Sequence, residues 1–147
     1  MSPPRTPAPG LAPLPPADRQ LAWIYGVTAT LVLCHEIDSA AWAEWDLFHL
    51  PGGAPLFVAL HLLLVPLVLA GGALILRQRP AARLVSLLVG AGGVAGGLAH
   101  TAFLVSGDPR FSTPLSLALV AAFGLASAVL VVAALRFHPA APSALPD

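Results

Sequence analysis

Apolar residues form four long stretches separated by short polar connections, and this pattern predicts an all-helical membrane protein. The stretches run over 21–34, 56–76, 84–105 and 115–135. A helix rises 1.5 Å per residue and needs about 20 residues to cross the hydrocarbon core, which the last three stretches satisfy. The first reaches that length only if its helix continues through His35 to about Ala41. We therefore predict an all-α fold, a bundle of four transmembrane helices.

Proline-rich segments flank the apolar region over residues 1–17 and 137–147. They lack apolar periodicity, so they bury too little surface to offset the entropy of ordering. We predict that both are disordered tails around one domain of residues 18–136. Between the first two crossings we predict a short amphipathic outer helix that ends at residues 50–53, Leu-Pro-Gly-Gly, because the Pro-Gly step breaks helices.

A second interpretation of the first stretch is a cleaved signal peptide. Arg19 precedes a 14-residue apolar run, and the sequence Ala-Trp-Ala at 41–43 fits the small-residue rule for a cleavage site. The polar residues at 35–38 lie between the run and that site, and the leader is long and proline-rich. Both features favour a helix that is retained.

Composition and charge narrow the class of protein. The chain of 147 residues is 57% hydrophobic and 10% charged, whereas soluble domains carry about 25% charged residues. Its net charge is zero and it has no run of Lys or Arg, which excludes the phosphate-neutralising surface of a nucleic-acid-binding protein. The single cysteine, Cys34, cannot form an internal disulfide and is either a buried apolar side chain or a soft metal ligand.

The arginines predict the orientation in the membrane. Those in the amino-terminal segment, the second connection and the end of the last helix are Arg5, Arg19, Arg77, Arg79, Arg83 and Arg136. By the positive-inside rule these face the cytoplasm, so both termini are cytoplasmic. The first connection carries Glu44 and Asp46 but no Lys or Arg, and is predicted to lie outside with Trp42 and Trp45 at the interface.

Three histidines, His35, His61 and His100, lie in three different apolar segments. His61 and His100 are predicted about 8–9 Å below the outer ends of their helices, and His35 lies at a similar level if its helix continues to Ala41. Ionisable residues inside a membrane are costly and usually face an interior with partners. Gly93 and Gly97 share a helical stripe with His100, which predicts that His100 faces the bundle.

Acidic residues of the first connection are candidate partners for these histidines. Imidazole and carboxylate ligands from separate helices suit zinc, iron or copper. Pro66 predicts a kink one turn below His61, which makes room for water or an ion. The candidate metal ligands are His35, Glu36, Asp38, Glu44, His61 and His100.

Other interpretations of the same residues stay open. The polar cluster can transfer protons or bind a quinone or lipid head group. The histidines can instead be helix-packing residues in a scaffold or an accessory subunit of a larger membrane complex. His61 and His100 can be axial ligands of one haem. Small residues on the last helix, Ala118, Ala122 and Ala126, provide a surface for a homo-oligomer.

The polar segment also carries a family resemblance. It contains His-Glu-Ile-Asp-Ser at 35–39, Glu-Trp at 44–45 and Leu-Pro-Gly-Gly at 50–53, followed by His61. This pattern resembles an uncharacterised family of small bacterial four-helix membrane proteins with an H-E-x-D…E-W…L-P-G-G signature, over roughly residues 20–136. The resemblance implies a multi-pass protein of the bacterial inner membrane. It implies no reaction, and the sequence does not choose between an enzyme and a binding protein.

Overall fold

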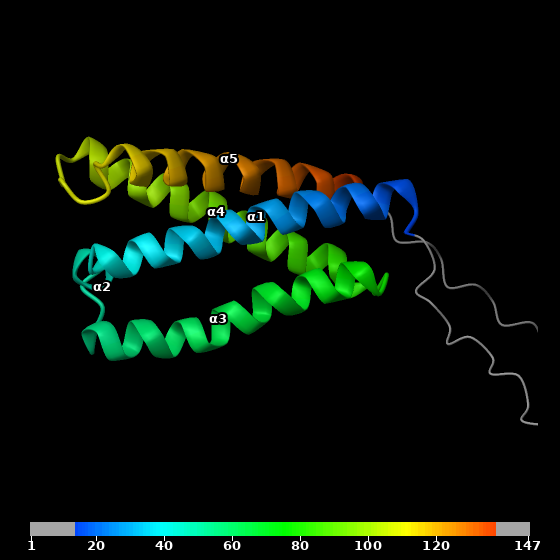
Figure 1. Cartoon of the computed structure of the whole chain (residues 1–147), viewed down its shortest axis with the longest axis horizontal. Coiled ribbons are helices and arrows are strands. Elements are labelled where there is room, and N and C mark those ends of the chain that lie inside the picture. Colours follow the sequence, from blue (N-terminus) through cyan, green and yellow to red (C-terminus); the bar gives the residue numbers. More distant parts are fainter. Residues whose placement is uncertain (1–13, 138–147) are drawn as a thin grey trace, which may run out of the picture.

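The computed structural model describes residues 14–137, and its regular structure in that range is entirely helical. The helices are α1 (Pro16–Ala41), α2 (Glu44–Leu47), α3 (Gly53–Leu76), α4 (Ala81–Val105) and α5 (Pro114–Arg136). The four long helices run alongside one another, and α2 lies at the same end of the molecule as the loop between α4 and α5 (Figure 1). The predicted all-α class is confirmed.

Local sequence signals explain where the long helices begin and end. Pro16 lies in the first turn of α1, where a missing N–H costs nothing. The helix continues to Ala41, the length at which His35 was predicted to reach the depth of His61 and His100. Thr113 caps α5 by accepting a hydrogen bond from the Ser116 N–H, and Pro114 is its first residue. Pro66 lies inside α3, and this helix changes direction near its middle (Figure 1).

Among the described residues, three helices are long and apolar enough to cross a membrane: α3, α4 and α5. Their length and apolar composition indicate a membrane protein. The helix α1 does not belong to this group, although its 26 residues exceed the length of the other helices. The polar residues at both of its ends explain the difference, because they lower its hydropathy.

Glycines set the close packing of α4 against α5, which is the most extensive helix contact in the fold. A Cβ atom at Gly93 would lie 2.8 Å from the Cβ of Ser127, and the Cα atoms of Gly97 and Gly124 face each other. Small residues of this kind allow helix backbones to approach. His100 lies on the same face of α4 and is 2% exposed, so its predicted inward orientation is confirmed.

The helix α3 packs less tightly than the others. It makes fewer contacts with α1 and α4 than α5 does, and it lies apart from them at the α2 end of the molecule (Figure 1). At the opposite end it is held by the Tyr25 hydroxyl, which donates to the Val68 carbonyl oxygen at 2.7 Å. A methyl group at Gly71 would overlap the Tyr25 ring. At the α2 end, α3 is held mainly by side-chain contacts, the His61 pair with Glu36 and the Phe57 ring against Trp45.

The main apolar core lies at the arginine-rich end. Leu21 and Tyr25 of α1 pack there with Ile75, Leu130 and other buried residues, so loss of α1 by cleavage would expose this core. Phe137 also belongs to this core and is 6% exposed, although the sequence placed it in the carboxy-terminal tail. The described residues exclude 138–147 of this predicted tail, His138 among them. They also exclude residues 1–13 of the amino-terminal tail.

The outer segment differs from the predicted amphipathic helix. After α1 ends at Ala41, Ala43 adopts a left-handed conformation with φ of 52°, and α2 that follows has only four residues. Left-handed alanine is uncommon, and nothing in the local sequence indicates it. The outer helix predicted to end at residues 50–53 is therefore reduced to the four residues of α2, and residues 35–41 belong to α1. The reversal at Ala43 instead directs Glu44 toward α4.

Candidate metal centre

Three of the predicted ligands meet at one point inside the bundle. One ring nitrogen of His35, one carboxylate oxygen of Glu44 and one ring nitrogen of His100 all lie within 4.8 Å of one another. They come from α1, α2 and α4, and the three residues are buried, with exposed fractions of 4%, 9% and 2%. A buried group of two imidazoles and one carboxylate has the composition of a transition-metal site.

The hydrogen bond of His100 determines which of its nitrogens is available. Nδ1 lies 2.9 Å from the carbonyl oxygen of Gly96, one turn earlier in α4, and donates its proton to it. In neutral imidazole the other nitrogen, Nε2, then carries a lone pair. Nε2 is buried without a hydrogen-bond partner, and it lies 3.3 Å from Oε1 of Glu44. With Nδ1 donating to Gly96, a neutral His100 and an ionised Glu44 both present acceptors to each other, and either a proton or a metal cation between them satisfies both.

Aromatic contacts hold the His35 ring in place. The ring stacks on Phe123 with centroids 4.2 Å apart, and it meets the edge of the His100 ring at 4.5 Å. Its Nε2 lies 3.4 Å from the Ser39 hydroxyl, whereas its Nδ1 is buried without a hydrogen-bond partner. The two histidines thus meet at the common depth expected from the sequence.

Glu44 is a buried acid with two close polar neighbours, His100 and Ser39. Burial raises the pKa of Glu44 above its ordinary value, and a hydrogen bond from Ser39 opposes that rise. Ser39 lies one turn after His35 on α1 and is fully buried, so its hydroxyl contacts both groups. We did not identify Ser39 as a site residue from the sequence; its spacing from His35 was the available signal.

His61 and Glu36 form a separate pair. Nε2 of His61 lies 2.7 Å from the Glu36 carboxylate, and its Nδ1 lies 2.7 Å from the Phe57 carbonyl oxygen. Both side chains are about one-fifth exposed. Because both nitrogens of His61 are engaged, neither is free to act as an axial haem ligand together with His100. Neither residue joins the cluster of His35, Glu44 and His100.

Asp38 lies on another side of α1 and contacts α5. Its carboxylate accepts a hydrogen bond from the Ser116 hydroxyl at 3.1 Å, and the indole of Trp42 donates to the same hydroxyl at 3.2 Å. Asp38 therefore connects α1 to the first turn of α5 and is not brought to the cluster. Cys34 and His49 are both exposed and also lie outside the cluster.

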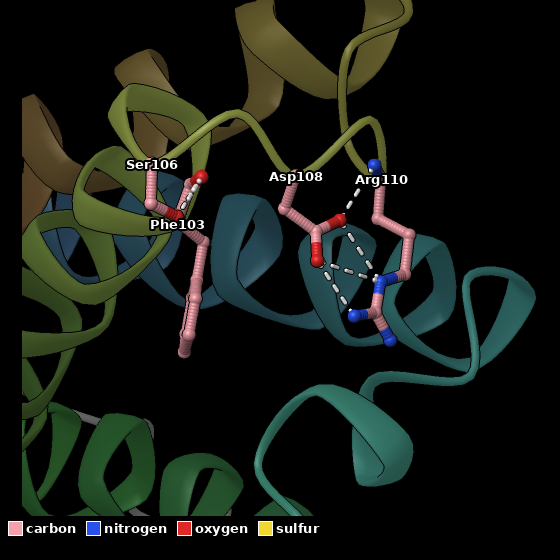
Figure 2. Close-up of polar contacts among 4 residues, drawn as sticks. All are labelled: Phe103, Ser106, Asp108 and Arg110. Atoms are coloured by element: carbon pink, nitrogen blue, oxygen red, sulfur yellow. Dashed lines mark hydrogen bonds and ion pairs between the residues drawn. The ribbon is translucent and has the colours of Figure 1, made fainter.

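The loop between α4 and α5 covers His100. Phe111 has a positive φ of 60°, is 1% exposed, and places its ring 4.5 Å from the His100 ring. Figure 2 shows the polar contacts of this loop, in which the Arg110 guanidinium pairs with the Asp108 carboxylate at 2.6 Å. These bonds from Arg110 lower the pKa of Asp108 to about 2. The sequence contained no signal that Phe111 reaches the site.

Comparison with known proteins adds a family but no activity. A family model described as a family of unknown function, DUF6713, matches residues 21–137. The chain belongs to the DUF6713 family. No curated protein and no solved structure matches this DUF6713 chain. The match agrees with the uncharacterised family predicted from the sequence, and the chemistry of the site must be argued from its geometry.

The geometry predicts that His61 is not a ligand of any metal ion that His35, Glu44 and His100 could hold. In the variant His61→Gln the amide can still donate to Glu36, so the outer end of α3 keeps its contact with α1. We expect metal stoichiometry and affinity equal to those of the unchanged protein, measured by titration of purified protein with zinc. Loss of metal binding in this variant would show that the ligand set includes His61.

Proposed function

We propose that this protein binds one transition-metal ion, zinc, iron or copper, through His35, Glu44 and His100. The site lies inside a bundle of four membrane-crossing helices, close to the extracytoplasmic face of a bacterial inner membrane. One observation carries the proposal: Nε2 of His100 and Oε1 of Glu44 lie 3.3 Å apart in a buried position, with no hydrogen-bond partner for Nε2.

A cation between these two atoms explains their approach. Burying two acceptors face to face is unfavourable unless a positive charge satisfies both. Two ligands bound to zinc at 2.0–2.1 Å in a tetrahedral arrangement lie about 3.3 Å apart, which agrees with the separation found here. With His35 as the third ligand, one position stays open for water or another molecule, as in catalytic zinc sites.

The membrane topology in this proposal includes α1 as a fourth crossing. Its 26 residues span about 39 Å, more than the hydrocarbon core requires. In the bundle, Arg19 and Arg136 belong to the end opposite α2, and that end is assigned to the cytoplasm by the positive-inside rule. The metal site beside α2 is then extracytoplasmic, and the start of α1 and the end of α5 are cytoplasmic.

Self-association is a separate part of the proposal. Ala118 on α5 is exposed, whereas Ala122 and Ala126 are half-buried beside α1. Ala118 is therefore the residue of this set that supports contact with a second copy or with another membrane subunit, because Ala122 and Ala126 already lie against α1. The apolar surfaces of α3, α4 and α5 contact the lipid bilayer in this proposal.

Metal analysis tests the central claim directly. Protein purified in detergent, stripped with a chelator and then titrated with zinc is expected to bind one ion per chain. Cobalt in place of zinc is expected to give the intense visible bands of a tetrahedral ion with nitrogen and oxygen ligands. Negligible metal uptake by well-folded protein would overturn the proposal and favour a packing role for the histidines.

A further inference from the structure

An elongated cavity of about 290 Å³ adjoins the candidate metal centre. His35, Glu44 and His100 line one part of it, and it continues along α4 to Val85. His100 and Val85 are fifteen positions apart, which corresponds to about 22 Å along the helix. Apart from the polar groups near the metal centre, the walls are aliphatic, aromatic or glycine. The cavity therefore combines a polar head region with a long apolar channel.

The cavity is bounded by side chains that also face the lipid. Leu67 of α3 and Leu88 of α4 line it and are 50% and 58% exposed. Gly92 lines it as well, and a Cβ atom at this position would meet nothing within 4 Å. These exposed side chains of α3 and α4 place one wall of the cavity against the bilayer. A ligand that reaches this cavity is therefore soluble in lipid.

The charges in the head region favour an anion. A divalent metal bound by the Glu44 carboxylate and two neutral imidazoles leaves one uncompensated positive charge. Glu36 also lines the cavity, but its carboxylate is paired with His61 at 2.7 Å. Uncompensated charge in an apolar interior is costly, so a ligand with one negative charge at its head is stabilised there.

We infer that the cavity binds a long-chain fatty acid, with its carboxylate at the open position of the metal and its alkyl chain along α4. The inference rests on the proposed metal site. The fatty acid reaches the cavity from the bilayer, and its chain replaces the lipid contacts of the cavity walls. Recognition combines coordination of one carboxylate with close packing of the alkyl chain against the apolar cavity walls.

Binding of radiolabelled palmitate to the full chain in detergent tests this inference. We expect zinc-loaded protein to bind palmitate about tenfold or more tightly than chelator-treated protein, a difference of about 1.4 kcal/mol. Methyl palmitate has the same chain without the charge, and it is expected to compete about tenfold or more weakly than palmitate. Equal competition by the ester would overturn the role of the carboxylate.

Two matched variants separate the cavity from the metal site. Gly92→Leu fills the channel without meeting existing atoms near its Cβ, whereas Gly26→Leu places the same side chain at an equally open position on α1 outside the cavity. Both variants are expected to bind one zinc ion. Only Gly92→Leu is expected to lose palmitate binding, by about tenfold or more.

The outcomes distinguish the two proposals. If the protein and both variants bind zinc, the fatty-acid inference fails and the metal site stands in either of two cases: the unchanged protein binds no palmitate, or Gly92→Leu binds palmitate as tightly as the unchanged protein. If the unchanged protein binds no zinc, the metal site fails and the inference fails with it, even where palmitate still binds. Equal palmitate affinity with and without zinc would also overturn coordination of the head group.

Discussion

Replacement of His100 by alanine is expected to weaken zinc binding by about 100-fold or more, since loss of even an outer contact to a ligand typically costs 10–100-fold. The variant removes the nitrogen that faces Glu44 at 3.3 Å and leaves only His35 and Glu44 as ligands. Titration of chelator-treated protein with zinc against a competing metal indicator measures the change. This is the largest effect on function that the geometry predicts.

His49→Ala is the matched control for this experiment. His49 follows α2 at the same end of the molecule, but it is exposed and lies outside the cluster of His35, Glu44 and His100. It is expected to bind zinc with unchanged affinity, and circular dichroism of both variants should show the same helical content. Equal zinc affinity in His100→Ala and His49→Ala would contradict the proposed ligand set.

Insertion of a single methyl group at Gly93 is expected to destabilise the protein by about 1–3 kcal/mol, as overpacking of a close interface does. A Cβ atom there would lie 2.8 Å from the Cβ of Ser127, which cannot move away without displacing α5. The free energy of unfolding can be measured by titration with SDS in mixed micelles. Because His100 is two turns further along α4, the same displacement is expected to weaken zinc binding.

Gly92→Ala controls for the effect of alanine on helix propensity. It makes the same substitution on the neighbouring residue of α4, where a Cβ atom meets nothing within 4 Å. Any gain in helix propensity applies to both variants, so their difference isolates the contact between α4 and α5. Gly93→Ala protein as stable as Gly92→Ala protein would show that this interface adjusts without cost.

Predictions based on local pattern agree well with the structure. The apolar stretches anticipated the four long helices, and the placement of His35 required the extension of the first one to Ala41. The glycine stripe predicted the inward orientation of His100, which is buried. These features depend on helical periodicity and on the cost of exposing polar groups to lipid, and both can be evaluated from neighbouring residues.

The division of the polar residues between sites could not be predicted in this way. Six ligands were proposed as one group, but Glu36 pairs with His61 and Asp38 contacts Ser116, so that three remain together. Helix faces near a helix end change by large angles when one residue is added or removed. The left-handed turn at Ala43 therefore decided which acid reached the histidines.

By itself, the sequence determined the helical class, the apolar segments and the presence of histidines at a shared depth, because each follows from hydrophobicity and helix geometry over a few turns. Only the tertiary structure decided that Glu44 is the acid beside His100, that Phe111 covers the site, and that a cavity extends from it along α4. Those features depend on how distant helices and loops pack, and the energies that select among such packings are distributed over many contacts.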